Sequence, residues 1–192
     1  MDNIVEIRER IQSALSLKQS VLDNVGLLAV TSQVVDIVVE AFRNDYKIFF
    51  CGNGGSAADA QHLAAEFSGR FYQDRDPLFA EAFHVNTSYL TAVANDYGYD
   101  QVYSRLVKAK CRKGDVLIGM STSGNSVNII KALELASSME ITTVSMTGET
   151  GGKMKEFSKY LINVPSVDTP RIQEVHMLLG HTICELVEQK MF

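Results

Sequence analysis

The feature that most constrains this chain is a short apolar run that leads through glycines directly into a helix pattern. Residues 47–51 (KIFFC) predict a buried strand, and residues 52–55 (GNGG) predict a tight turn, because glycines adopt backbone conformations closed to other residues. Ser56 is a favourable N-cap for the alanine-rich helix that follows. A strand, a glycine turn and a helix N-terminus form an anion site, since unpaired amides and the helix dipole meet there.

A second segment repeats this arrangement. Residues 115–120 predict a short strand, and residues 127–137 predict a helix that begins just after a polar turn. Hydroxyl groups at a helix N-terminus can hold a phosphate through hydrogen bonds, without a lysine. The turn offers four of them, on Ser121, Thr122, Ser123 and Ser126. It is not the nucleotide-binding P-loop, whose motif ends in lysine and a hydroxyl residue. A capped turn without a ligand is the alternative, and the first glycine turn weakens it.

Strand and helix patterns alternate through the rest of the chain. Further strands are predicted over 79–85, 140–146 and 160–164, and helices over 87–94, 100–110, 154–158 and 171–190. This alternation predicts a parallel sheet with helices on both faces. Ligands bind at the carboxyl ends of the strands in such sheets. Because both turns follow strands at that edge, we expect them to converge.

Two helix patterns precede the first strand. Residues 2–22 are amphipathic, and residues 24–43 are apolar around more of the helix circumference. The apolar stripe of the first consists of Ile4, Ile7, Ile11, Leu15 and Leu22. Together the two helices carry more apolar surface than one small sheet covers, which indicates oligomerisation. Packing within the same domain is the alternative.

Composition excludes several classes of function. The chain has 192 residues, of which 46% are hydrophobic, and this suits one globular domain. Its net charge is -5, and its lysines and arginines form no cluster, which argues against a nucleic-acid partner. The N-terminus lacks a signal-peptide pattern, and no stretch approaches the length needed to span a bilayer. We therefore expect a cytoplasmic protein with no membrane partner.

The three cysteines, Cys51, Cys111 and Cys184, are widely spaced and lie in apolar surroundings. An odd number at such spacing suits reduced core thiols better than a disulfide framework or a zinc knuckle. Cys51 lies beside the glycine turn, but no neighbouring cation or paired histidine marks it as an activated thiolate. We expect it to be structural.

Side chains that carry chemistry lie on two of the predicted helices. His62 and Glu66 are four residues apart, so they share one helix face and can bind one ion or one substrate. Gln173 and His181 are eight residues apart, roughly 80° around the helix axis, which is near enough to border one cavity. A solvated helix face and a core histidine are the alternatives. The polar break at residues 95–99 (NDYGY) is either a plain turn or part of a site.

Taken together, these segments resemble the sugar isomerase (SIS) domain family and, within it, the phosphoheptose isomerases. The resemblance is carried by CGNGGSAADAQHLAAEFSGRF, ANDYGY, GMSTSGNS, TGETGGKM and TPRIQEVHMLLGH. It implies a flavodoxin-like, three-layer α/β fold with a five-stranded parallel sheet and an N-terminal helical extension. Residues 1–192 would form a single SIS domain, with helices over 1–44 and the sheet core and C-terminal helix over 45–192. It also implies a homotetramer whose sites lie at subunit interfaces.

The resemblance also implies roles for individual residues. Glu66 and His181 would exchange the proton, and zinc would be held by His62, Glu66, Gln173 and His181. The residues expected to contact the sugar phosphate are Asn53, Gly54, Gly55, Asn95, Asp96, Ser121, Thr122, Ser123 and Ser126. We add Ser56, Glu66 and Gln173 to this substrate-binding set, because they border the same turn and helix faces.

The activity that the resemblance implies is interconversion of D-sedoheptulose 7-phosphate and D-glycero-D-manno-heptose 7-phosphate through an enediol. The product would supply ADP-heptose for the lipopolysaccharide core or another heptose-containing glycan. One alternative is a non-catalytic tetramer of the same fold that binds a replication-initiator protein. Such chains lack the acidic residue and the terminal-helix histidine that Glu66 and His181 provide here. Another alternative, an arabinose 5-phosphate isomerase, usually carries additional domains.

Overall fold

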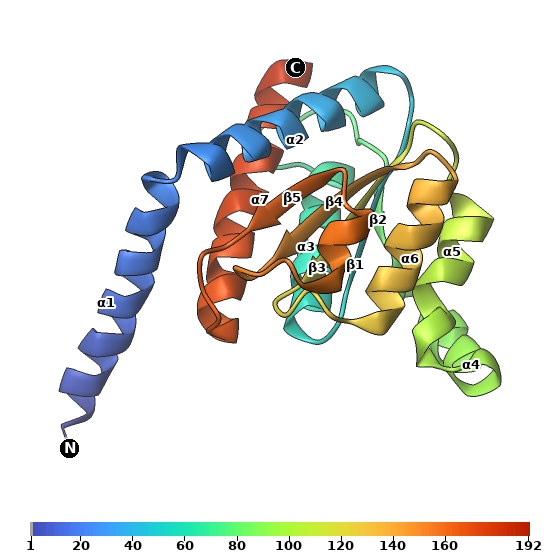
Figure 1. The fold of residues 1–192 in the computed structure, drawn as a ribbon. Coiled ribbons are helices and arrows are strands. Elements are labelled where there is room, and N and C mark those ends of the chain that lie inside the picture. The colour runs from blue at the N-terminus through green and yellow to red at the C-terminus, as the bar shows by residue number, and fades with distance from the viewer. Residues whose placement is uncertain (1) are drawn as a thin grey trace.

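Five parallel strands form the centre of the computed structural model, which describes residues 2–192 (Figure 1). The strands are β1 (Ile48–Gly52), β2 (Ala80–Ala82), β3 (Val116–Ser121), β4 (Thr142–Thr147) and β5 (Tyr160–Asn163). They are arranged in the order β2-β1-β3-β4-β5, which is the flavodoxin-like order. The predicted α/β fold with a five-stranded parallel sheet is confirmed.

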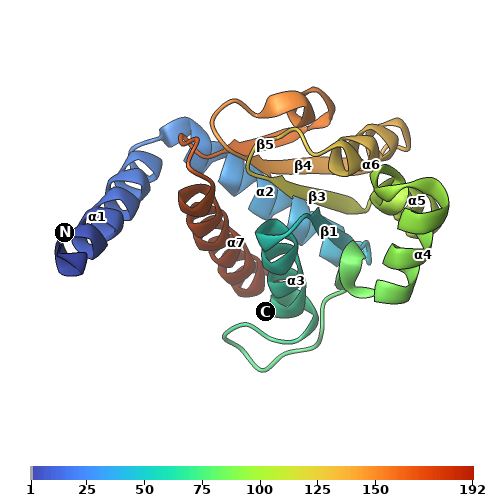
Figure 2. The same ribbon diagram turned by 90° about the horizontal axis from the view of Figure 1, so that it is seen from below.

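Helices cover both faces of this sheet (Figures 1 and 2). The α-helices are α1 (Asn3–Leu22), α2 (Val25–Arg43), α3 (Gly55–Ser68), α4 (Thr87–Tyr97), α5 (Val102–Lys110), α6 (Val127–Ser138) and α7 (Thr169–Met191). Three short 3-10 helices, η1 (Phe83–Val85), η2 (Tyr99–Gln101) and η3 (Gly152–Phe157), complete the described elements. Helices α2, α3 and α7 lie on one face, and α5 and α6 lie on the other.

Alternation along the strands divides the buried side chains into two cores. In β1, Ile48 and Phe50 pack with the helices α2, α3 and α7, whereas Phe49 and Cys51 pack with α5 and α6. Every residue of β1 is buried, as expected for a parallel strand with helices on both sides. The run KIFFC is therefore apolar throughout because neither face of its strand meets water.

Three local predictions are wrong. The strand expected over 79–85 is reduced to β2, and the chain then turns into η1. The helix expected to end at residue 94 continues to Tyr97 and stops at Gly98, whose φ of 88° ends the helical backbone. Ser56 is not the N-cap of α3; that position is held by Gly54, with φ 54° and ψ -123°. Local patterns do not set these boundaries, because tertiary packing decides where an element ends.

Helix α2 is long and apolar enough to cross a membrane by length and composition, so the expectation that no stretch approaches that length is wrong. A buried core helix passes the same test, and 44% of the apolar stretch in α2 is buried. In this fold α2 packs on α7 and β5 (Figure 1). Its inner face includes Val34, Val35 and Val38.

Helix α1 projects away from the sheet (Figures 1 and 2). Its apolar stripe, predicted from the sequence, is left largely uncovered by the rest of this chain. The side chains of Ile4, Ile7, Ile11, Leu15 and Leu22 are between 54% and 64% exposed.

The three cysteines are free and buried, as predicted. Burial raises the pKa of the Cys51 thiol far above its ordinary value, and the nearby Cys111 raises it further. Burial likewise raises the pKa of Cys111 to about 12. These thiols are protonated at neutral pH, so Cys51 is a core residue and not a nucleophile.

His176 lies on the inner face of α7 and is fully buried, with its Nε2 atom 3.2 Å from the carbonyl oxygen of Thr147. Burial lowers the pKa of His176 to about 4, although the contact with Thr147 opposes the shift. The folded state therefore holds this ring neutral. Because the unfolded chain takes up the proton first as the pH falls, stability is present above the ordinary histidine pKa and is lost below it.

We predict that, as the pH falls from 6 to 4, protonation of His176 in the unfolded chain lowers the free energy of unfolding by about 1.4 kcal/mol per pH unit. Urea unfolding of the wild type and of His176→Gln, at one protein concentration and several pH values, measures this pH dependence. Glutamine is the matched replacement because it does not titrate but retains a donor for the Thr147 carbonyl. The two proteins should diverge as the pH falls. Parallel pH profiles would contradict a neutral buried His176.

Candidate active site

The two polar turns predicted from the sequence lie side by side. One connects β1 to α3 and the other connects β3 to α6, and β1 and β3 are paired neighbours in the sheet. The chain crosses from β1 to β2 on one side and then to β3 on the other, so the direction of winding reverses between β1 and β3. Ligands bind at such a switch point in open α/β sheets, because the loops there diverge and leave a crevice. The predicted convergence of the turns is confirmed.

The first turn presents backbone amides at the start of α3. Gly54 adopts a positive φ, and within the described residues no side chain caps the helix. Gly52 is required for close approach, because a Cβ there would lie 2.3 Å from the carbonyl oxygen of Ser56. Gly55 faces Gln173 of α7, whose Nε2 atom would lie 2.5 Å from a Cβ at that position. This turn thus has the uncapped helix N-terminus that an anion needs.

The second turn gathers three hydroxyl groups at the start of α6. The Oγ atom of Ser121 lies 2.9 Å from that of Ser126 and 3.4 Å from that of Ser123. Ser126 is the N-cap residue, yet its side chain makes no capping hydrogen bond in the part of the chain that the structure describes. The hydroxyls and the first amides of α6 therefore remain available together, which is suitable for a phosphate group.

A partly buried amide pair joins the two turns. Asn53 donates to the Oδ1 atom of Asn128 at 2.9 Å, and Asn128 donates back to the Oδ1 atom of Asn53 at 2.9 Å. Asn128 lies in the first turn of α6 and is only 3% exposed. The hydroxyl of Tyr99 also donates to Asn53, at 3.1 Å. Each amide pairs polar groups of the other that would otherwise be partly buried and unpaired. The two hydrogen bonds therefore hold the two turns next to each other.

Sequence reasoning missed Asn128 and Tyr99. The only signal for Asn128 was an amide at a position flanked by Val127 and Ile129, which alone does not identify a partner. In the segment that contains Tyr99, the predicted residues Asn95 and Asp96 are exposed and hydrogen-bond to each other at 2.9 Å. Tyr99 is the residue through which this segment contacts the first turn.

Two further predicted residues of the turns, Ser56 and Thr122, face the start of α7. The Nε2 atom of Gln173 lies 3.5 Å from the hydroxyl of Ser56, and the hydroxyls of Thr122 and Thr169 are 3.4 Å apart. Ser56 is 3% exposed, so its hydroxyl faces α7 and not solvent. The N-terminal part of α7 therefore borders both turns.

Further along the same two helices, His62, Glu66 and His181 form a cluster. Helices α3 and α7 pack side by side (Figure 2). The Nε2 atom of His62 lies 2.9 Å from the Oε1 atom of Glu66 and 3.1 Å from the Nε2 atom of His181. The side chain of His62 is 50% exposed and that of Glu66 is 23% exposed, so solutes can reach the cluster. The predicted pairing of His62 with Glu66 is confirmed, and the fold adds His181.

Such a cluster requires a positive charge or a shared proton, because two imidazole nitrogens and a carboxylate oxygen repel one another through their lone pairs. The carboxyl of Asp59 lies one helical turn before His62, and its Oδ2 atom is buried without a hydrogen-bond partner among residues 2–192. Burial raises the pKa of Asp59, and the nearby His62 opposes this shift. Two carboxyl groups, those of Asp59 and Glu66, thus lie near His62, which suits a bound cation.

The cluster is also chemically suitable for zinc. One ligand atom from each of the three residues lies within 4.8 Å of the others. Nitrogen and carboxylate ligands about 2.0–2.1 Å from a tetrahedral zinc ion lie about 3.3 Å from each other, close to the separations seen here. Gln173, the fourth predicted ligand, is placed against Ser56 in this structure. Three of the four predicted ligands thus converge.

The fold and this site agree with comparisons to known proteins. Residues 19–148 match the SIS domain family. The chain therefore belongs to this family, and it is an isomerase. It is 50% identical over 186 residues to the phosphoheptose isomerase of Aneurinibacillus thermoaerophilus, covering 97% of this chain and 94% of that protein.

Two solved structures of phosphoheptose isomerases are similar to this chain over nearly its whole length. That from Neisseria gonorrhoeae is 42% identical, with a TM-score of 0.90 and coverage of 96% of this chain and 97% of that chain. That from Francisella tularensis is 31% identical, with a TM-score of 0.94 and coverage of 98% and 100%. The alternative of a non-catalytic chain that binds a replication-initiator protein gains no support from these relatives.

We predict that Asn128→Leu, which preserves the approximate side-chain volume, lowers the free energy of unfolding by about 1–3 kcal/mol, because it leaves the Nδ2 donor of Asn53 without its acceptor. Asn95→Leu is the matched control; its side chain is exposed, so we expect a change within about 0.5 kcal/mol. Urea unfolding measures both. Equal losses in the two variants would contradict a structural role for the amide pair.

Proposed function

We propose that this protein interconverts D-sedoheptulose 7-phosphate and D-glycero-D-manno-heptose 7-phosphate. The proposal rests on one observation: Glu66 of α3 and His181 of α7 lie close together. The N-termini of the same two helices border the turns that we propose bind the phosphate. His62 follows Ser56 by six residues, which is roughly 9 Å along α3. An extended seven-carbon sugar phosphate can place its phosphate at the turns and its carbonyl end near the cluster.

The reaction moves a carbonyl group from C2 to C1 and needs only proton transfers. A base removes a proton from C1 while the C2 oxygen is protonated, which gives an enediol. Return of a proton to C2 and loss of the proton on the C1 oxygen then gives the aldose. We assign the transfer at C1 to the carboxylate of Glu66, and the transfer at C2 or its oxygen to the imidazole of His181. Their partial exposure lets substrate reach both groups.

We assign substrate binding to the residues of the two turns and their neighbours. The serine hydroxyls and the uncapped amides of α3 and α6 would bind the phosphate. Side chains next to the turns would hydrogen-bond to the sugar hydroxyls. The proposed set is Asn53, Gly54, Gly55, Ser56, Glu66, Asn95, Asp96, Ser121, Thr122, Ser123, Ser126 and Gln173.

We propose that His62, Glu66 and His181 hold a zinc ion, with Gln173 as a fourth ligand. When bound, zinc would supply a Lewis acid that polarises the substrate carbonyl. The carboxylate and the two imidazoles are ligand types that suit this ion.

We further propose that four chains associate and that the exposed stripe of α1 is covered by other copies. Its five apolar side chains are more than half exposed in one chain, which a soluble assembly would bury. The partly exposed cluster at α3 and α7 is suitable for a site completed at a subunit interface. We place the enzyme in the cytoplasm, supplying ADP-heptose for the lipopolysaccharide core or another heptose-containing glycan.

The first test is conversion of sedoheptulose 7-phosphate by the purified wild type and by Glu66→Gln and His181→Asn. We expect each variant to lose roughly a hundredfold or more in kcat, because general acid–base groups contribute about that much. Glu134→Gln, the same change at an exposed position on α6, is the control and should retain activity.

Incorporation of solvent deuterium at C1 and C2 then tests the order of the transfers. Loss of exchange at C1 in Glu66→Gln is expected. Normal turnover in either catalytic variant would refute the assignment of that residue. If the wild type fails to convert the substrate at all, the proposed reaction is wrong.

We predict that His62→Asn weakens zinc binding by at least ten- to a hundredfold, the range already seen when only an outer-shell partner is lost. Competition with a chromophoric chelator measures the affinity. His84→Asn is the matched control, because it removes a histidine outside the cluster. If the two variants bind zinc equally well, the ion does not bind at this cluster.

We predict that Ile7→Glu combined with Ile11→Glu dissociates the assembly, because both side chains are more than half exposed on one face of α1. Light scattering should give the mass of four 21.2 kDa chains for the wild type and a smaller mass for this variant. Arg8→Glu introduces the same acidic side chain at an exposed polar position of α1 and should leave the mass unchanged. A wild-type mass of one chain would end the proposal.

A further inference from the structure

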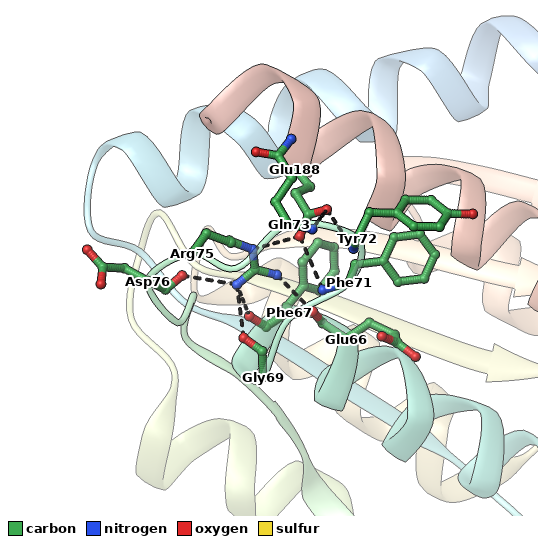
Figure 3. A network of polar contacts seen from close by, with 9 residues as sticks. All are labelled: Glu66, Phe67, Gly69, Phe71, Tyr72, Gln73, Arg75, Asp76 and Glu188. Carbon is green, nitrogen blue, oxygen red and sulfur yellow. Dashed lines mark hydrogen bonds and ion pairs between the residues drawn. The ribbon is translucent and has the colours of Figure 1, made fainter.

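A buried ion pair lies where α3 ends and α7 approaches its C-terminus (Figure 3). The Nε atom of Arg75 is 2.9 Å from the Oε1 atom of Glu188, and both side chains are only 2% exposed. Arg75 belongs to the segment of residues 69–78, which contains no helix or strand. Most ion pairs of this protein are far more exposed, including Lys190 with Asp36 on the same end of α7. The Arg75–Glu188 pair is therefore part of the protein interior and not a surface ion pair.

Glu188 holds the backbone of this segment. Its carboxylate accepts hydrogen bonds from the amides of Phe71, Tyr72 and Gln73, at 3.1, 2.8 and 3.0 Å (Figure 3). Burial raises the pKa of Glu188, but these amides and Arg75 outweigh it and hold the pKa below its ordinary value. The carboxylate is thus charged and almost fully hydrogen-bonded.

Arg75 caps the C-terminus of α3. Its guanidinium donates to the carbonyl oxygens of Glu66 and Phe67, both at 2.8 Å, and to those of Gly69 and Asp76, at 3.2 and 3.0 Å (Figure 3). The last carbonyl groups of a helix lack partners within it, and a cation there also interacts favourably with the helix dipole. The guanidinium therefore fixes the last turn of α3, and with it the backbone of Glu66.

The same segment contacts the other half of the cluster. The ring of Phe71 lies 5.7 Å from the imidazole of His181, measured between centroids. Glu188 follows His181 by seven residues, which is about two turns, so the two side chains point to nearly the same side of α7. Arg75 and Glu188 thus connect the backbone of Glu66 to the element that packs on His181.

We propose that Arg75 and Glu188 form one brace that positions Glu66 relative to His181 for proton transfer. The inference rests on the proposed isomerase function. Both are positioning residues, and neither touches the substrate. A buried ion pair is seldom a gain over apolar packing. The pair lies between the two helices that carry the proposed acid–base groups, and this location provides a reason for the pair. A catalytic group misplaced by about 1 Å can lose up to a hundredfold in rate.

The test compares Glu188→Gln, Arg75→Met and the double variant, with Lys190→Met as control. Each single change should lower kcat roughly ten- to a hundredfold and change KM less than about twofold, since binding at the turns is unaffected. The double variant leaves no uncompensated buried charge, so it should fold, and it should lose no more than the worse single change. Lys190→Met breaks an exposed pair on the same helix and should behave as the wild type.

Ring signals of the four histidines in a ¹H–¹³C NMR spectrum provide a readout that needs no turnover. In Glu188→Gln the signal of His181 should shift, whereas that of His176, buried on the same helix, should not. The ring signals test the brace even if the protein lacks the proposed activity. Full kcat in folded variants, losses that multiply in the double variant, or equal shifts of His176 and His181 would each overturn the proposal.

Discussion

The parallel pairing of β1 with β3 is the interaction on which the rest of the structure depends. It places two helix N-termini next to each other at the point where the sheet reverses its winding direction. The reciprocal amide bonds of Asn53 and Asn128 then join the two turns. Because neither N-cap residue, Gly54 or Ser126, makes a side-chain capping hydrogen bond among the described residues, amides at the start of both helices and the helix dipoles remain available to an anion. The same pairing that builds the core thus builds the proposed phosphate site.

Close packing of α3 against α7 produces the second part of the site. Both helices start at the carboxyl edge of the sheet and run back across the same face (Figure 2). Gly180 permits their approach, because a Cβ there would lie 2.6 Å from a methyl carbon of Leu63. Ser56 meets Gln173 near the start of the pair, and His62 meets His181 further along. One helix pair therefore carries both the residues proposed to anchor the substrate and those proposed for the acid–base chemistry.

Several features of the site could be predicted from local sequence because they depend on helix geometry or backbone freedom alone. His62 and Glu66 share a face since they are four residues apart, and their contact at 2.9 Å follows. The glycine turns were recognisable because they need φ values open to glycine. Local patterns failed for the Ser56 cap and for Asn128, whose partner lies 75 residues away in the chain. No local rule identifies a partner at that separation.

The sequence by itself determined the alternation of strands and helices, the two turns and the pairing of His62 with Glu66, because each of these depends on neighbours in the chain. Only the tertiary structure decided that His181 joins that pair and that Gln173 lies against Ser56. It also decided that the irregular segment around Arg75 ties α3 to Glu188 of α7. These contacts join residues more than a hundred positions apart, so they arise only once the sheet has ordered its strands and brought α3 and α7 together.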